Sequence, residues 1–227
     1  METVLITGAS RGIGLELTRQ FLDLGYYVIS TYRGLPSAKL ESLLSNKALT
    51  LFELEVTDET SINNLASTLA STKIDILINN AGILGSSDQS MRAIEPKEWL
   101  DTFAVNTIAP LMVSRAFMNR LEASSNPRIV TISSQMGALN RDSTGMYAYR
   151  SSKAAVNKVM QVLALELKPK GIIVCPVHPG WVKTDMGGEG ADITVEESAS
   201  GIVALVQSLT TEQSGKFLTW QGDEHVW

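Results

Sequence analysis

Tyr149 and Lys153 are the two residues of this chain whose types and spacing point most directly to chemistry. Four positions apart on a predicted helix, they would lie one turn apart and face the same way. A tyrosine with its ordinary pKa of ~10 is a poor acid-base catalyst at neutral pH, but a neighbouring ammonium favours the phenolate and lowers that pKa. Lowering it by ~3 units corresponds to ~4 kcal/mol, which requires a partly desolvated site. The pair therefore predicts a proton-transfer centre.

The strand that precedes this helix ends in two serines, Ser133 and Ser134. A Tyr-x-x-x-Lys spacing alone is common on solvated helix faces, where it has no catalytic role. Hydroxyl groups at the end of a neighbouring strand favour the catalytic interpretation, because they would stand beside the start of the helix.

A glycine-rich turn, Thr7 to Gly14, lies between a short apolar strand at residues 4–6 and an amphipathic helix. A strand, a turn and a helix in this order present backbone N–H groups and the positive end of a helix dipole to an anion such as a phosphate or pyrophosphate. The spacing is G-x-x-x-G-x-G. Gly8 would make the sharp turn, Gly12 would let the pyrophosphate approach the backbone, and Gly14 would let the helix pack on the strand.

The same turn also reads as G-x-S-x-G, the nucleophile elbow of a serine hydrolase. Ser10 would then be the nucleophile, with His178 or His225 as its base. Such an elbow normally follows several strands, whereas only one strand precedes it here. This alternative also leaves the Tyr149 and Lys153 pair unexplained.

Two arginines flank the expected binding site for the adenosine ribose. An NAD site would place an acid about 20 residues after the glycines, at the end of the second strand. That position holds Arg33, and no acid occurs between residues 26 and 40. Arginine binds phosphate bidentately and suits the 2′-phosphate of NADP, and Arg11 in the glycine loop adds a second cation. The alternative is that both side chains simply face solvent.

Strands and helices alternate along the chain, which predicts the open α/β sheet needed to position these residues. The predicted strands are residues 4–6, 26–32, 49–56, 74–78, 128–132, 172–176 and 215–220. Predicted helices start at residue 13, at 38, after the capping residue Asp58, at 96, at 149 and at the capping box of Thr194 and Glu197. The segment 79–82 follows the fourth strand, where open sheets bind ligands.

The predicted helix at residues 96–121 contains Asn106 and Pro110. Because proline has no N–H, the carbonyl of Asn106 loses its helical partner, and the helix should bend there. The freed carbonyl is either a tolerated defect or a group that the site uses.

Composition excludes several classes of protein. A chain of 227 residues that is 44% hydrophobic can bury one substantial core, and we expect one domain. A net charge of -5 with 19% charged residues gives no reason to expect binding to nucleic acid or to an acidic membrane. No run is long enough to span a membrane, and the early first strand leaves no room for a signal peptide. Cys175 is the only cysteine and there are two histidines, so we expect no disulfide, no metal site and a cytoplasmic location.

Taken together, these motifs resemble those of the classical short-chain dehydrogenase/reductases over the whole chain. The matching pieces are Thr7 to Gly14, Asn79 to Gly82, Asn106, Ile132 to Ser134, the Tyr149 and Lys153 pair, and Pro179 with Gly180. The stretch 179–188 and the terminal Trp227 are more narrowly similar to sniffer-type carbonyl reductases and C-factor-like proteins.

The resemblance implies a single Rossmann-type domain, residues 1–227, with a doubly wound, seven-stranded parallel sheet ordered 3-2-1-4-5-6-7. It also implies a catalytic tetrad. Tyr149 would be the acid in carbonyl reduction, and Lys153 would lower its pKa and hold the nicotinamide ribose. Ser134 would hydrogen-bond the substrate oxygen, and Asn106 would hold a water of the proton relay. The expected function is reversible, NADPH-dependent reduction of an aldehyde or ketone.

For the cofactor, NADP(H), the resemblance assigns contacts along the whole carboxyl edge of the sheet. Glu55 stands where the family usually has Asp to meet the adenine amino group, and Thr184 would contact the nicotinamide end. The full expected set is Gly8, Ser10, Arg11, Gly12, Ile13, Gly14, Arg33, Glu55, Val56, Asn80, Ala81, Gly82, Tyr149, Lys153, Pro179, Gly180, Val182 and Thr184.

The remaining expectations concern substrate, assembly and an alternative role. The apolar side chains of Leu84, Met136, Met146, Trp181 and Met186 are expected to line a pocket for a small carbonyl compound, covered by a glycine-rich lid at 183–193. A homodimer or homotetramer is expected on the helices at 96–121 and 149–168. The C-factor resemblance also leaves open a non-catalytic, dinucleotide-binding signalling protein.

Overall fold

A computed structural model describes all residues, 1–227, and shows one seven-stranded sheet in which every neighbouring pair is parallel. The strand order is β3-β2-β1-β4-β5-β6-β7, so the predicted fold and order are confirmed. The strands are β1 Thr3–Ile6, β2 Tyr27–Tyr32, β3 Leu49–Glu53, β4 Ile76–Asn79, β5 Arg128–Ile132, β6 Ile173–His178 and β7 Leu218–Thr219.

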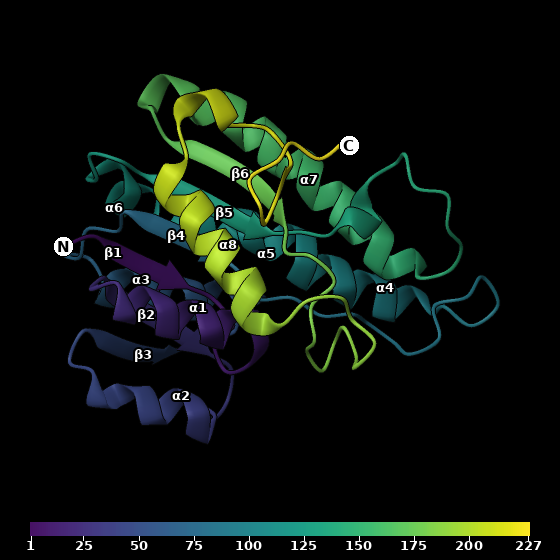
Figure 1. Ribbon diagram of the computed structural model, residues 1–227, viewed down its shortest axis with the longest axis horizontal. Helices are drawn as coiled ribbons and strands as arrows, with labels where there is room; N and C mark the ends of the chain where they lie inside the picture. The colour runs from purple at the N-terminus through teal and green to yellow at the C-terminus, as the bar shows by residue number, and fades with distance from the viewer.

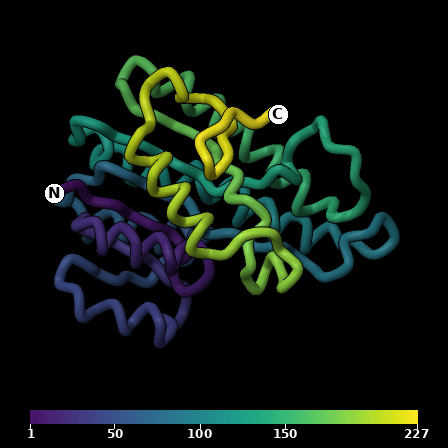
Figure 2. The backbone as a smooth tube through the Cα atoms, in the orientation of Figure 1, coloured from purple at the N-terminus to yellow at the C-terminus, as the bar shows by residue number.

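Helices cover both faces of this sheet (Figure 1). They are α1 Gly12–Asp23, α2 Ala38–Ser42, α3 Glu59–Thr68, α4 Pro96–Phe103, α5 Ala109–Ala116, α6 Met118–Glu122, α7 Tyr147–Leu167 and α8 Val195–Ser208. Helices α1 and α8 pack on one face, and α3, α5 and α7 pack on the other. Figure 2 shows the loops before α4 and before α7 extending together beyond one end of the sheet.

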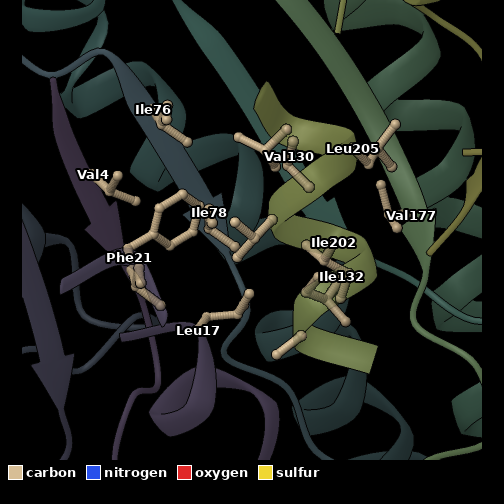
Figure 3. Close-up of a cluster of buried hydrophobic side chains, with 14 of the residues drawn as sticks. Val4, Leu17, Phe21, Ile76, Ile78, Val130, Ile132, Val177, Ile202 and Leu205 are labelled. Atoms are coloured by element: carbon tan, nitrogen blue, oxygen red, sulfur yellow. The ribbon is translucent and has the colours of Figure 1, made fainter. Parts of the chain in front are cut away.

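Side chains of the strands alternate between the two cores because successive residues of a strand point to opposite faces. Val4 and Ile6 join Leu17 and Phe21 beneath α1 and α8, as Figure 3 shows for part of this cluster, whereas Leu5 faces the opposite core. Both faces are therefore buried, which explains the nearly continuous apolar sequence of these strands. Each such fully buried large side chain stabilises the fold by about 2 kcal/mol.

The predicted helix at 96–121 is interrupted near Asn106. A π-helical segment, Ala104–Ile108, follows α4, and the amide of Ala109 donates to the carbonyl of Ala104, five residues back. Pro110 stands in the first turn of α5, where its missing N–H costs little. The chain breaks again at Phe117, between α5 and α6.

Several strand boundaries differ from the prediction, most clearly in the third, sixth and seventh strands. The third strand ends at Glu53 instead of Val56, and the sixth runs on to His178. The closing strand is only Leu218–Thr219, because the chain at 215–216 completes a turn and the chain after Trp220 folds back to form an antiparallel bridge between Leu218 and Glu224. No helix combines the length and the apolar character needed to cross a bilayer.

Candidate active site

The predicted site residues gather at the carboxyl edge of the sheet, where β1, β4, β5 and β6 end side by side. Such an edge is where open α/β sheets bind ligands, and the strand order reverses here between β1 and β4. Helix α7 brings Tyr149 and Lys153 to the end of β5, and both side chains are buried. The Lys153 Nζ atom lies 5.7 Å from the centre of the Tyr149 ring.

The Lys153 ammonium is held by the end of β5. Its Nζ donates to the carbonyl oxygen of Ile132 at 2.9 Å. Burial lowers the pKa of Lys153 to about 8. The buried ammonium is thus anchored by one hydrogen bond to the last residue of β5, two residues before Ser134.

The pKa of Tyr149 differs from the sequence-based expectation. Burial raises it above the ordinary value, and the influence that lowers it is a hydrogen bond with Ser134. The Lys153 ammonium, which was expected to lower this pKa, is directed at the Ile132 carbonyl instead. In this structure the phenol is therefore held in its protonated form, the form that a proton donor needs.

Ser134 is fixed against α7 by the turn that follows it. Its hydroxyl accepts from the amide of Met136 at 3.1 Å. A Cβ on Gly137 would come within 2.5 Å of the carbonyl carbon of Lys153, so the turn packs directly on the backbone of the helix. This contact explains why glycine occupies position 137, and it fixes the serine relative to Tyr149.

Asn106 projects from the π-helical segment into the fold and is buried. Its Oδ1 accepts from the amide of Ile83 at 2.9 Å, and its Nδ2 donates to the carbonyl of Ile83 at 2.8 Å and to the hydroxyl of Ser152 at 3.1 Å. The side chain therefore clamps the chain after β4 to α7. Both N–H groups of its side-chain amide are used, so a water could be held only through an acceptor, the second lone pair of Oδ1 or the main-chain carbonyl.

The glycine loop has the shape that a phosphate cradle requires. Gly8 and Gly12 have positive φ angles of 69° and 53°, and a Cβ on Gly8 would lie 2.8 Å from the Cα of Ala81. A Cβ on Gly14 would lie 2.4 Å from Nδ2 of Asn80. No side chain caps the amino end of α1, so its first N–H groups remain available to an anion. These residues fit the pyrophosphate of a dinucleotide.

Thr7 joins the glycine loop to the end of β4, a role that the sequence analysis did not assign. Its hydroxyl accepts from the amides of Asn80 and Ala81 at 3.0 and 3.1 Å. Asn80 returns two bonds from Nδ2 to the carbonyls of Thr7 and Gly8, each 2.9 Å. In the sequence, this role of Thr7 is indicated by a hydroxyl residue that stands between the apolar strand and the first glycine.

The two predicted cofactor cations have different environments. Arg33, at the end of β2, lies 3.8 Å from a carboxylate oxygen of Glu55, whose other oxygen accepts from Thr57. Both residues stand at the expected adenosine end of the crevice. Arg11 instead points across the glycine loop and donates to Asp185 at 2.6 Å.

The segment after β6 lies over the glycine loop. Gly180 has a φ of 89°. A parallel β-bridge between Val182 and Ile193 closes the base of the loop that runs from one residue to the other. The Thr184 hydroxyl accepts from the amide of Gly187 at 3.0 Å, and a Cβ on Gly12 would touch the Thr184 methyl group at 3.4 Å. Pro179 is held through its carbonyl, which accepts from Ser198.

A cavity of about 450 Å³ opens beside Gly82, at the carboxyl edge of the sheet. A Cβ on Gly82 would lie 3.7 Å from the Lys153 Nζ, so this wall of the cavity packs near the lysine. None of Asn106, Ser134, Tyr149 and Lys153 lines the cavity itself. It is lined by Arg11, Gly82, Ile83, Leu84, Gly85, Ser86, Glu98, Asp101, Thr102, Asp185 and Met186. Of the five expected pocket residues, Leu84 and Met186 line it, whereas Met136, Met146 and Trp181 do not. Three carboxylates make its wall more polar than we expected.

The serine hydrolase alternative fails because neither histidine is placed to act as a base for Ser10. Neither imidazole hydrogen-bonds the Ser10 hydroxyl: His225 contacts the carbonyl of Val226, and Nδ1 of His178 is buried without a partner. Burial and the charges of His225 and Arg141 lower the pKa of His178 to about 4. The two histidines pack on each other, with ring centres 5.9 Å apart.

Comparison with known proteins places this geometry in a family. Residues 2–192 match the family model described as short chain dehydrogenase. The chain belongs to this family. It is 35% identical to the C-signal of Myxococcus xanthus, in an alignment that covers 71% of this chain and 98% of that protein.

Solved structures of family members have the same fold as this chain. The carbonyl reductase Sniffer of D. melanogaster superposes with a TM-score of 0.94 at 30% identity, and all of both chains is covered. An NADPH-bound carbonyl reductase from chicken fatty liver gives a TM-score of 0.92 at 34% identity, with 100% of this chain and 99% of that chain covered. The expected similarity to short-chain dehydrogenases, and to Sniffer carbonyl reductases in particular, is confirmed.

Proposed function

We propose that this protein reduces an aldehyde or ketone to an alcohol with NADPH, in a reversible hydride transfer. The observation that carries the proposal is the burial of Tyr149 and Lys153 at the end of β5, beside Ser134 and next to an open glycine cradle. A protein that only binds a dinucleotide needs no buried proton donor. The similarity to carbonyl reductases supports the same assignment.

In this mechanism the chain supplies the proton and orients the carbonyl. Tyr149 donates its phenolic proton to the carbonyl oxygen, and Ser134 donates a hydrogen bond to the same oxygen. The raised pKa of Tyr149 keeps that proton in place at neutral pH. Lys153 stabilises the phenolate that remains, and Asn106 holds the loop after Gly82 against α7.

NADPH, when bound, supplies the hydride. The glycine loop would hold its pyrophosphate, Arg33 with Arg11 its 2′-phosphate, and Lys153 its nicotinamide ribose. Glu55 and Val56 lie after β3, near the adenine position, and Val182 and Thr184 lie at the nicotinamide end. The substrate would enter the cavity beside Gly82, between Leu84 and Met186.

The decisive experiment follows the oxidation of NADPH at 340 nm with a panel of neutral aldehydes and ketones. Wild type should turn over at least one of them. Tyr149→Phe keeps the ring and removes the proton, so it should bind NADPH normally and lose nearly all turnover. A wild-type protein that binds NADPH and oxidises none of it would favour the alternative left open by the resemblance to C-factor-like proteins, a non-catalytic dinucleotide-binding signalling protein.

We further propose that the protein acts as a cytoplasmic homodimer or homotetramer. Helices α4 and α7 pack together through a bond from the Trp99 indole to Ser151, and they carry the exposed apolar side chains of Leu100 and Leu165, 70% and 69% accessible. A second copy packed on these helices would remove both side chains from water. Light scattering at micromolar concentration should show an oligomer, and Leu165→Glu should shift the mass towards that of the monomer.

A further inference from the structure

Gln89 lies in the loop between β4 and α4 and is 2% exposed, although a glutamine normally remains in contact with water. Both ends of its side-chain amide are used. The Oε1 atom accepts from the amide of Tyr149 at 2.9 Å, and Nε2 donates to the carbonyls of Leu84 and Ser86 at 2.7 and 3.1 Å. One buried side chain thus joins the catalytic helix to the wall of the substrate cavity.

Helix α7 needs such a partner because it has no cap of its own. Its N-cap residue is Met146, which has a positive φ of 55° and offers no side-chain acceptor. The first N–H groups of a helix have no partner within the helix. Gln89 supplies an acceptor for one of them, at the residue that carries the phenol, and its main-chain carbonyl accepts from Tyr147.

The other end of Gln89 fixes the cavity wall. Leu84, Gly85 and Ser86 all line the cavity, and Nε2 bonds the carbonyls on either side of Gly85. Gly85 has a φ of 88°, and a Cβ there would lie 3.2 Å from Nε2. The tight, left-handed turn at Gly85 is thus held in shape by the glutamine amide.

We propose that Gln89 is a positioning residue of the reductase: it sets the distance between the substrate-binding wall at 84–86 and the phenol of Tyr149. The proposal rests on the proposed function, because it assigns a role within that reaction. Gln89 acts through the backbone of Tyr149 and through the cavity loop. A change at Gln89 therefore affects the alignment of substrate with phenol without removing any group that reacts.

Two substitutions separate the two ends of the amide. Gln89→Glu has the same shape and keeps an acceptor for the Tyr149 amide, but its second oxygen faces the carbonyls of Leu84 and Ser86 and repels them. Its expected effect is mainly on the cavity wall, as a severalfold rise in KM for the carbonyl substrate. Gln89→Met has a similar length and removes both ends. It should raise KM and also lower kcat by about 100-fold, because a shift of about 1 Å at the reacting groups has that effect.

The control is a buried polar residue far from the site. Asp75 lies at the opposite end of β4, where it accepts from the amide of Thr3 and the hydroxyl of Ser124. Asp75→Asn should lower the melting temperature and leave kcat and KM near the wild-type values. The Kd for NADPH and the melting temperature of every variant are measured beside the kinetics, so that loss of folded protein is corrected for.

The results separate failure of this inference from failure of the proposed function. If wild type oxidises NADPH with a carbonyl substrate, and both Gln89 variants retain its kcat and KM while folded, then Gln89 has no positioning role. If both variants lose activity only in proportion to folded protein, as Asp75→Asn does, its role is structural and the inference is wrong. If wild type itself shows no turnover with any carbonyl compound, the proposed function fails first.

Discussion

Arg11 of the glycine loop donates a 2.6 Å hydrogen bond to Asp185 of the segment after β6. The two residues are 174 positions apart in sequence, and both side chains are about three-quarters exposed. A guanidinium proposed to bind a cofactor phosphate is thus already paired with a carboxylate. Because one guanidinium fork binds one such partner well, Asp185 and the phosphate compete for Arg11.

Removing the competing carboxylate should strengthen cofactor binding. Exposed ion pairs contribute about 0–1 kcal/mol, so Asp185→Asn should lower the Kd for NADPH by at most about fivefold. The gain should shrink at high salt, because exposed charges are screened. Fluorescence titration at 50 and 500 mM salt measures both effects. Asp192→Asn, an exposed acid in the same segment with no ion pair, is the matched control. An unchanged Kd for Asp185→Asn would show that Asp185 does not compete with the phosphate for Arg11.

The preference for NADPH should depend on Arg33. Arg33→Asp places a second acid near Glu55, which lies 3.8 Å from the guanidinium, so a 2′-phosphate would meet two negative charges. We expect the Kd for NADPH to rise at least tenfold, about 1.4 kcal/mol, while the Kd for NADH stays the same or falls. Arg115→Asp, a charge-matched change in the Arg115–Glu59 pair between α5 and α3, should alter neither. Equal wild-type affinities for the two cofactors would contradict this assignment.

The effects of Tyr149 and Lys153 on turnover should be far from additive. Tyr149→Phe should nearly abolish reduction, and Lys153→Met should weaken both turnover and NADPH binding. Once the phenol is gone, no phenolate remains for the ammonium to stabilise, so Lys153→Met should cost little further turnover in the Tyr149→Phe background. Single-turnover rates for the four proteins measure the coupling. Strictly multiplicative losses would mean that the two residues act independently.

The buried ammonium of Lys153 should reduce the stability of the fold. Its pKa is about 8 in the folded protein against an ordinary value of 10.5, so the folded state disfavours the charged form. At about 1.4 kcal/mol per pKa unit the penalty for keeping Lys153 charged is about 3 kcal/mol. The methionine variant escapes this penalty but loses the bond to the Ile132 carbonyl, which contributes about 1 kcal/mol. Lys153→Met should therefore raise the free energy of unfolding at pH 7 by about 2 kcal/mol.

The effect of Lys153 on stability should depend on pH. Below pH 8 the lysine is protonated in both states and the penalty is complete. Between pH 8 and 10.5 only the unfolded state keeps the proton, so wild-type stability rises relative to that of Lys153→Met. Urea unfolding of both proteins at pH 7 and 9.5 should show the difference narrowing. A less stable Lys153→Met at pH 7 would mean that the site solvates its ammonium.

The sequence was sufficient to predict the strands of the sheet, and the family resemblance supplied their order. Each strand of a parallel sheet is buried on both faces and reads as a short apolar run, so β1 and β4 were visible from composition alone. Glycines in the loop after β1 were visible for a different reason, because close backbone approach admits no side chain. The two-residue β7 has no comparable signal, since both ends of the predicted segment 215–220 lie in turns.

Contacts between distant segments could not be predicted from local pattern. Nothing near Gln89 or Asp185 indicates that one would meet the amide of Tyr149 and the other Arg11, because those pairings depend on where whole loops fold. The direction of the Tyr149 pKa shift was missed for a related reason. The sequence places a cation one turn from Tyr149. The burial of the phenol and the hydrogen bond from the ammonium to the Ile132 carbonyl depend on the folded structure.

The number of residues in the π-helical segment at 104–108 determines where Asn106 points. A regular α-helix turns about 100° per residue, and this segment holds one residue more than a regular turn would. Asn106 lies within this segment, and its side chain bonds Ile83 on one side and Ser152 on the other. Deleting one residue here would restore a regular α-helix and rotate Asn106 by about a quarter turn away from Ile83 and Ser152. Insertions and deletions in this short stretch are therefore more consequential than most substitutions, although the helix looks like simple scaffold.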